Sequence, residues 1–425
     1  MFESLVVLTG VVCGVGILHG YLKYRDPFHP LVLMLPMCAF IYVLMPWLLG
    51  RDGTLYSYVS EPQATWVQSI ILAGLVLLIL GLHAGSAVKV QPVWANRYAV
   101  VNVGRLHKGA YVLGGMGVLA WFYAISNVGG ITEAFSRPKG FGWSELGFIR
   151  ESAYLMIVAL LLLFAPQGYQ PRNRLWRMAV VVCSIPYLLQ GLLGAQRGPT
   201  FLIVATIGIS YYLARGKRPS LPAMIGAGAA LGFLMLFLVM NRGNIYLGSE
   251  AELSTDVSGF FEANEANEYI FGAGCMVAAD QTDRYFWGKR YLAQVLVRPI
   301  PRQIWPNKYE DFGVPELLQN AGVAGDGLQS VMGWGEIPGA AAAMIADLWV
   351  EFSWLTLPVL FIIGYLFAAA WRKAVVLSGP YITQYTIFVL LSVYFVSQSG
   401  EAVIFRLLIL SLPAWHIWRR AALTA

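Results

Sequence analysis

The chain has 425 residues, of which 58% are hydrophobic and only 12% charged, with 29 Lys and Arg against 23 Asp and Glu. A soluble domain carries roughly 25% charged residues, so this composition excludes an ordinary soluble enzyme. The basic residues are spread along the chain, which argues against a nucleic-acid partner. The four cysteines form no metal-binding spacing with histidines. We therefore expect neither a metal nor a cofactor.

Apolar runs long enough to cross a bilayer, about 20 residues each, recur from one end of the chain to the other. They predict an all-α, polytopic integral membrane protein with about eleven transmembrane helices. The runs lie near Leu5–Leu22, Pro30–Leu49, Trp66–Gly85, Ala110–Ile125, Ala153–Ala165, Met178–Gly194, Thr200–Leu213, Ala223–Met240, Phe352–Trp371, Tyr381–Val396 and Ala402–Ile417.

One connection is far longer than the others. We divide the single membrane domain into residues 1–241 with eight spans, a large polar loop at 242–350, and residues 351–425 with three spans. A loop of this length without structure is unusual, so we expect short helices packed on the membrane domain. Its segment Ala263–Asp280 is too polar to span and too apolar to be solvated, which predicts a membrane-surface or re-entrant helix.

Positive charge alternates between successive connections. One set is rich in Lys and Arg: residues 23–25, 89–108, 172–177, 215–218, 372–373 and 419–420. Because such loops stay in the cytoplasm, the N-terminus is predicted outside, the C-terminus inside, and the large loop on the outer face. Of the 23 acidic residues, only Asp26 falls in a predicted cytoplasmic connection, in agreement with this topology.

The large loop contains a basic and aromatic stretch interrupted by prolines. Pro299, Pro301 and Pro306 prevent a helix and predict an extended path. On such a path Arg298, Arg302 and Lys308 can point at one space and bind phosphate oxygens. Flat surfaces for sugar rings are offered by Trp287, Trp305 and Tyr291. A belt resting on anionic lipid headgroups would use the same residue types.

Further charged residues lie at predicted outer membrane edges. Arg197 and Arg284 are additional candidates for phosphate binding, although a snorkelling arginine is an equally simple account of Arg197. Arg406 lies inside the last span, five residues beyond Glu401, and a structural ion pair there is the simpler interpretation.

If a reaction on the outer face needs a general base, a carboxylate is the candidate, because all five histidines fall on the predicted cytoplasmic side. Asp347 and Glu351 are four residues apart and so share one helical face. Glu336 is a third candidate. The alternative is that Asp347 and Glu351 orient their helix by bonding a basic residue of the loop.

Three stretches carry a resemblance to a known family. Tyr285–Lys308 (YFWGKRYLAQVLVRPIPRQIWPNK) resembles the loop signature of Wzy-type oligosaccharide repeat-unit polymerases, which read G-K-x-Y-L followed by I-P-R-x-x-W-P-x-K. Asp347–Ser353 (DLWVEFS) is similar to their E-[LI]-Y-x-N-F-G motif, with Asp347, Glu351 and Ser353 replacing the Glu, Asn and Gly. Asn264–Tyr269 (NEANEY) resembles the helix that precedes the signature.

The resemblance implies a glycosyltransferase of O-antigen or other surface polysaccharide biosynthesis, in the bacterial inner membrane. It would move a growing glycan from undecaprenyl diphosphate to the non-reducing end of a lipid-linked repeat unit on the periplasmic face. Donor and acceptor are then both lipid-linked oligosaccharides in the bilayer, and a chain-length regulator and a flippase are implied as partners. We expect an inverting, metal-independent transfer.

Two other functions remain open from the sequence. An O-antigen ligase-like enzyme shares the span count and large loop, but typically uses a periplasmic histidine that this chain lacks. A transporter or flippase for lipid-linked glycans would carry charges near mid-membrane, often in two related halves. Here the polar residues gather on one side of the membrane, which favours a reaction at the membrane surface over transport across it.

Overall fold

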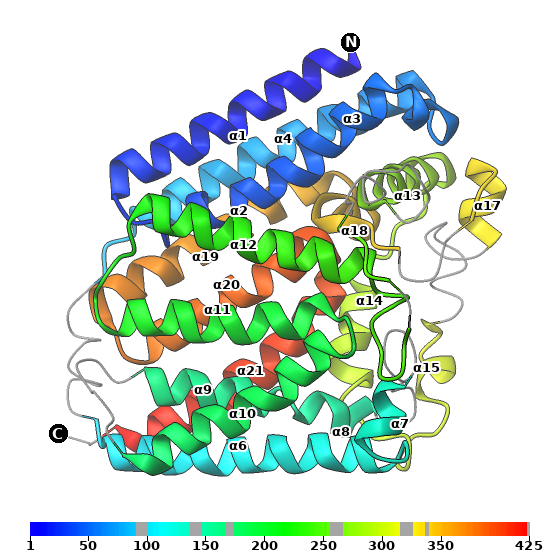
Figure 1. Ribbon diagram of the computed structural model, residues 1–425. Helices are drawn as coiled ribbons and strands as arrows, with labels where there is room; N and C mark the ends of the chain where they lie inside the picture. The colour runs from blue at the N-terminus through cyan, green and yellow to red at the C-terminus, as the bar shows by residue number, and fades with distance from the viewer. Residues whose placement is uncertain are drawn as a thin grey trace. The chain divides into compact units, whose positions relative to one another are not determined.

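The computed structural model describes residues 1–90, 101–136, 147–165, 173–250, 252–255, 267–314, 326–335 and 340–422 (Figure 1). In these ranges the chain forms helices and one isolated bridge, between Val101 and Ala422, and no strand. It divides into two compact units. Unit 1 contains Met1–Val88, Phe261–Ala370 and Leu391–Phe405, and unit 2 contains Lys89–Phe260, Trp371–Leu390 and Arg406–Ala425.

The helices of unit 1 come from both ends of the chain. The early ones are α1 (Phe2–Tyr24), α2 (Pro30–Ala39), the π turn η1 (Phe40–Leu44), α3 (Met45–Arg51), the 3-10 turn η2 (Thr54–Ser57) and α4 (Glu61–Ser86). The later ones are α13 (Glu268–Thr282), α14 (Lys289–Leu292), the π turn η5 (Ala293–Val297), α15 (Lys308–Asp311), α17 (Asp326–Met332), α18 (Ala343–Phe352) and the 3-10 turn η6 (Ser353–Leu355).

Unit 2 is built from the middle of the chain. Its helices are α6 (Val103–Ser126), α7 (Ile131–Phe135), α8 (Gly147–Ser152), α9 (Leu155–Phe164), α10 (Arg174–Leu192), α11 (Arg197–Ala214) and α12 (Leu221–Met240). Three more helices contribute residues to both units: α19 (Thr356–Leu377), α20 (Pro380–Ser397) and α21 (Gly400–Ala421).

Every apolar run predicted from the sequence coincides with a helix. Among the described residues, nine helical segments are long and apolar enough to cross a membrane. Two shorter apolar helices, Leu155–Phe164 and Gly198–Ala214, fall on the remaining predicted spans. The prediction of an all-α, polytopic membrane protein is therefore confirmed, whereas the number of spans and their orientation stay predictions.

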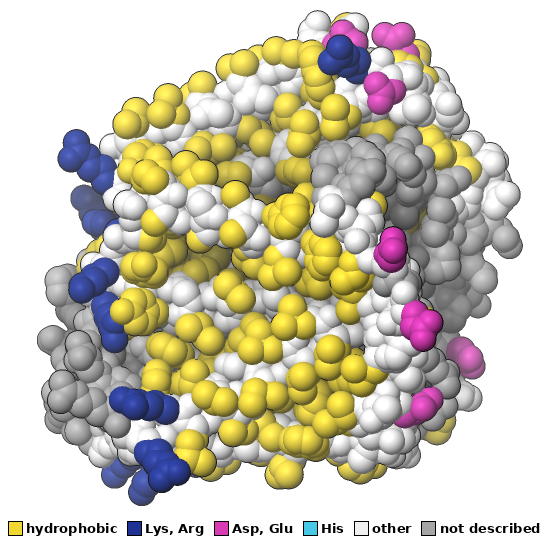
Figure 2. All heavy atoms as spheres, in the orientation of Figure 1, with side chains coloured by type: hydrophobic (Ala, Val, Ile, Leu, Met, Phe, Trp, Pro, Cys, Tyr) yellow, Lys and Arg dark blue, Asp and Glu magenta, His cyan; other side chains and the backbone are white. Residues whose placement is uncertain are grey.

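Exposed basic residues gather at one end of the helices of unit 2. Hydrophobic side chains cover α6, α10, α11 and α12 on the face shown in Figure 2, with Lys and Arg at one end and Asp and Glu at the other. Exposed Arg105 and Lys108 begin α6, Arg174 begins α10, and Arg215 follows α11. The same end of several antiparallel helices thus carries the basic residues, as the alternation of charge predicts.

Small residues let α4 and α19 approach closely in unit 1. A side chain at Gly81 or Gly85 would collide with the carbonyl oxygen of Phe361 or Tyr365, and one at Gly364 with that of Leu78. Glycines on facing turns thus bring the two backbones into contact, as is common between membrane helices. This contact fixes the helix that follows the DLWVEFS motif against the early part of the chain.

Gln68 of α4 joins the early and late helices of unit 1. Its side-chain amide donates to Thr9 Oγ1 at 3.0 Å and to the Tyr42 carbonyl oxygen at 3.1 Å, and its Oε1 accepts from the Tyr269 hydroxyl at 2.9 Å. The Tyr42 hydroxyl accepts from the Ile345 N–H at 2.9 Å. Because these groups are buried, the bonds specify where α13 and α18 sit.

The structure argues against one of the two alternatives predicted for Ala263–Asp280, a membrane-surface helix, whereas the re-entrant alternative stays a prediction. Within its described part, α13 begins after the cap Asn267, whose side chain accepts from the Tyr269 and Ile270 N–H groups. All residues from Tyr269 to Ala279 are buried, so the helix has no exposed face. A surface helix would keep one polar side in water, whereas a helix that is apolar all round is a core element. Helix α13 is therefore a buried helix of unit 1.

Candidate functional site

The first half of the Tyr285–Lys308 motif closes the end of α18. The last carbonyls of a helix lack partners inside the helix. Here the Val350 and Glu351 carbonyl oxygens accept from the N–H groups of Phe286 and Trp287, at 3.1 and 2.7 Å. Trp287 and Gly288 both have positive φ, 53° and 80°, so the chain turns sharply there. This turn directs the next residues, at the start of α14, toward α18.

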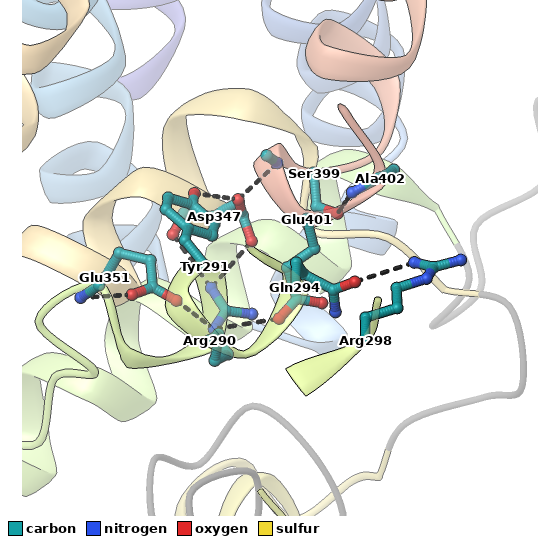
Figure 3. A network of polar contacts seen from close by, with 11 residues as sticks. Arg290, Tyr291, Gln294, Arg298, Asp347, Glu351, Ser399, Glu401 and Ala402 are labelled. Carbon is teal, nitrogen blue, oxygen red and sulfur yellow. Dashed lines mark hydrogen bonds and ion pairs between the residues drawn. The ribbon is translucent and has the colours of Figure 1, made fainter. Parts of the chain in front are cut away.

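Arg290 is the centre of a buried charge network. Its Nε donates to Glu351 Oε1 at 2.5 Å, and its Nη2 donates to Asp347 Oδ1 at 2.9 Å (Figure 3). Its guanidinium also lies 4.5 Å from the centre of the Phe286 ring. Burial alone would lower the pKa of Arg290, but the carboxylates of Asp347, Glu351 and Glu401 raise it above its ordinary value. The guanidinium therefore stays charged.

Both carboxylates of α18 have all their oxygens occupied. Asp347 Oδ2 accepts from the Tyr291 hydroxyl at 2.5 Å and from the Gly400 N–H at 2.8 Å. Glu351 Oε2 accepts from the Gly288 N–H at 2.8 Å. Burial, and then the charge of Asp347, raise the pKa of Tyr291, so its hydroxyl remains a donor. We name Arg290, Tyr291, Asp347, Glu351 and the Gly400 N–H the Arg290 network.

The network agrees with one of the two roles that the sequence left open for Asp347 and Glu351. The two residues do share a face, as their spacing predicts, and both bind a basic loop residue. Their side chains are 1% and 0% exposed. In this structure, neither carboxylate is accessible to a substrate in solution.

Lys308 is turned into the protein, where it holds the proline-containing loop 298–308. Its Nζ donates to three carbonyl oxygens, those of Val297 at 3.1 Å, Arg298 at 2.9 Å and Ile300 at 2.5 Å. Pro299 and Pro301 have no N–H, so the backbone here has fewer donors and the ammonium adds hydrogen bonds to those it makes. Burial, and then repulsion by Arg302 and Arg298, lower the pKa of Lys308.

The path of this loop differs from the prediction. The prolines exclude a helix between Arg298 and Asn307, as expected, but the chain forms turns there instead of an extended strand. The Ile304 and Trp305 N–H groups both bond the Pro301 carbonyl oxygen, at 3.0 and 3.1 Å. The loop therefore folds around the buried Lys308 through turns, and Lys308 does not point outward with Arg298 and Arg302.

Arg298 and Arg302 remain on the outside of the loop. Arg298 is half-buried; its Nη1 donates to Gln294 Oε1 at 2.8 Å and its guanidinium lies 4.5 Å from the Phe405 ring centre. Arg302 is exposed and makes no hydrogen bond or ion pair within the described part of the chain. Of the three predicted phosphate-binding cations, Arg302 is therefore the one most available to a ligand.

The remaining predicted site residues are dispersed. Trp287 is 57% exposed and stands edge-on to Tyr285, so its ring is accessible. It lies at the N-terminal end of the α14–η5 helical segment and Arg298 at the other end, about 15 Å apart along the axis. Trp305 is half-buried and its Nε1 donates to Asp311 at 2.5 Å. Tyr291 uses its hydroxyl within the Arg290 network.

The structure describes less of the surroundings of three further predicted site residues. Arg284 is exposed just after α13, and its N–H bonds the Ala279 carbonyl oxygen at 3.2 Å. Arg197 begins α11, but its side chain lies outside what the structure describes, as does the whole of Glu336. Their predicted roles therefore stay predictions.

Two charged residues of this region had no predicted role in the site. Arg290 lies within the Tyr285–Lys308 motif. The sequence could have indicated its role, because two acids on one buried helical face need a cation as partner. Glu401, at the start of α21, lies with its Oε1 3.9 Å from Arg290 Nε. No local spacing links Glu401 to the loop, so only the fold reveals this proximity.

In comparisons with known proteins, no family model, curated protein or solved structure matches this chain. The motif resemblance to Wzy-type polymerases therefore stays a prediction from the sequence. What the structure adds is the class: a polytopic helical membrane protein with a buried charge network beside a loop that presents arginines.

Proposed function

We propose that the protein is a membrane-embedded glycosyltransferase that polymerises a surface polysaccharide. It would move a growing glycan from undecaprenyl diphosphate to the non-reducing end of a lipid-linked repeat unit, on the periplasmic face of the inner membrane. The observation that carries the proposal is the loop 298–308, on which an internally bonded Lys308 holds Arg298 and Arg302 at the outside.

The chemistry of the transfer requires such cations. When the bond between the sugar and the diphosphate breaks, negative charge grows on the leaving diphosphate. A guanidinium that is already in place stabilises this charge without reorganisation, and its planar fork fits two phosphate oxygens. We assign this role to Arg302, which is exposed, with Arg298 beside it.

The roles of the other candidates follow from their bonding. Lys308 holds the loop, since its three donors are already used by backbone carbonyls. Asp347 and Glu351 are positioning residues, because they are buried and fix Arg290 and the turn at Gly288. Trp287 offers an accessible ring for a sugar of the glycan.

The arrangement supports polymerisation over a ligase that depends on histidine. Three histidines of unit 1 gather near the C-terminal end of α4: the rings of His19 and His83 are 5.4 Å apart, and His29 bonds Ser86 at 2.8 Å. His83 follows Gln68 by about 22 Å along the same helix. These histidines therefore lie toward the opposite end of α4 from Gln68, which bonds Tyr269 of α13.

The proposal is tested with a strain that lacks this gene. If the protein is a polymerase, the deletion strain accumulates single lipid-linked repeat units and loses long-chain surface glycan on gels. The wild-type gene restores the ladder, whereas Arg302→Ala lowers polymer formation at least about 100-fold. Arg51→Ala is the matched control, since Arg51 is an exposed cation of the same unit, and it should restore the full ladder.

A binding measurement separates the role of Arg302 from the stability of the protein. Purified wild-type protein should bind undecaprenyl diphosphate in detergent, and Arg302→Ala should bind it at least ten-fold more weakly with an unchanged unfolding temperature. An unaltered glycan ladder in the deletion strain would overturn the proposed function. Equal binding by the wild type and Arg302→Ala would remove Arg302 from the site.

A further inference from the structure

Three carboxylates surround the one guanidinium of Arg290, and they differ sharply in access. The side chains of Asp347 and Glu351 are 1% and 0% exposed, whereas that of Glu401 is 29% exposed. A reaction that takes a proton from a glycan hydroxyl needs a carboxylate that the hydroxyl can reach. Only Glu401 of these three meets that condition.

The bonding of the three carboxylates separates them in the same way. The oxygens of Asp347 and Glu351 accept from Arg290, Tyr291 and backbone N–H groups. Glu401 accepts no hydrogen bond within the residues that the structure describes, and its closest ionic contact is Arg290 Nε at 3.9 Å. Its oxygens are therefore available to accept a proton from an incoming group.

Glu401 is held in place although it is not itself bonded. It is the second residue of α21, and the N–H of the residue before it, Gly400, donates to Asp347 at 2.8 Å. A side chain at position 400 would meet the Tyr291 hydroxyl at 2.6 Å. The Arg290 network thus fixes the first turn of α21, and with it the backbone of Glu401.

Glu401 and Arg298 of the loop 298–308 lie on one side of α21. Phe405 is four residues after Glu401, so the two share a helical face, and the Arg298 guanidinium lies on the Phe405 ring. Figure 3 shows Glu401 between Arg290 and the pair formed by Gln294 and Arg298. A partly exposed carboxylate therefore stands next to a cation suited to a diphosphate.

We propose that Glu401 is the catalytic base of the transfer reaction, an inference that rests on the proposed function. The acceptor hydroxyl oxygen attacks the anomeric carbon of the donor sugar, and its proton passes to the Glu401 carboxylate. The bond from that carbon to the diphosphate oxygen breaks, and its electron pair leaves with the lipid diphosphate. Glu401 then releases the proton to water, so no oxidant, reductant or other co-reactant is needed.

The test uses purified full-length protein and the lipid-linked glycan fraction extracted from the deletion strain. Glu401→Gln keeps the size of the side chain but removes the base, so the turnover rate should fall at least about 100-fold. Binding of undecaprenyl diphosphate should change by less than about two-fold, because the arginines remain. Glu401→Asp keeps a carboxylate and should recover part of the rate.

Stability distinguishes this role from a structural one. Glu401→Gln should unfold within a few degrees of the wild type, whereas Asp347→Asn, which alters a buried and fully bonded group, should unfold earlier. A wild type that does not extend the extracted glycans would defeat the proposed function itself. An active wild type with an equally active Glu401→Gln would defeat only the assignment of Glu401, as would a variant that loses turnover only because it unfolds.

Discussion

Arg290 and Glu351 are 61 positions apart in the chain, yet Nε of the one donates to Oε1 of the other at 2.5 Å, with both side chains buried. A buried ion pair is costly to assemble and more costly to break, because the remaining partner keeps its charge without compensation. The contact joins the motif at 285–308 to the motif at 347–353. It therefore brings two separate stretches of sequence into one buried network.

Replacing Arg290 by Met should destabilise the protein by about 3–5 kcal/mol, the usual effect of leaving buried charges without a partner. The measurement is thermal unfolding of the purified protein in detergent. The triple variant Arg290→Met, Asp347→Leu, Glu351→Leu removes all three charges and should regain most of the loss. A single variant as stable as the wild type would contradict the network.

Lys308→Met should loosen the loop 298–308 while leaving the helices intact. It removes three hydrogen bonds from a charged donor, each worth about 1.5–3 kcal/mol. Limited proteolysis should then cut within the loop at least ten-fold faster than in the wild type. Lys308→Arg should not restore protection, because a planar guanidinium cannot direct its donors to the same three carbonyls.

Gln68→Leu should weaken the attachment of α13 to the early helices. The substitution leaves the Tyr269 hydroxyl without its acceptor in a buried position, at a cost of about 1–3 kcal/mol. Hydrogen exchange of the amides of α13 should accelerate. Gln68→Glu keeps an acceptor and should lose less stability if the acid stays protonated, and exchange unchanged in Gln68→Leu would show that α13 does not depend on this bond.

The distribution of basic residues predicts which side of the membrane each connection occupies. A reporter that is active only in the cytoplasm should be active when fused after Arg218 or at the C-terminus, and inactive when fused after Asp52. A cysteine introduced at Arg302 should be labelled by a reagent that cannot cross the membrane. The reverse pattern would place the loop 298–308 in the cytoplasm and remove the site from the periplasmic face.

The sequence predicted the helices well because long apolar runs have few alternatives in a membrane. It also predicted that Asp347 and Glu351 share a face, since this follows from helical geometry alone. It did not predict that Lys308 turns inward, because that depends on how the turns after Val297 place three backbone carbonyl oxygens. It could not place Glu401 beside Arg290, because this proximity arises only when α21 packs against the loop.

The hydrogen bond between Gln68 and Tyr269 also bears on biosynthesis. The two residues are 201 positions apart, so at about 5–20 residues per second a ribosome needs roughly 10–40 s to deliver the partner. During that interval α4 is already in the bilayer with one amide oxygen unmatched. A chain that ends before Tyr269 therefore lacks the donor that this buried amide oxygen has in the folded protein.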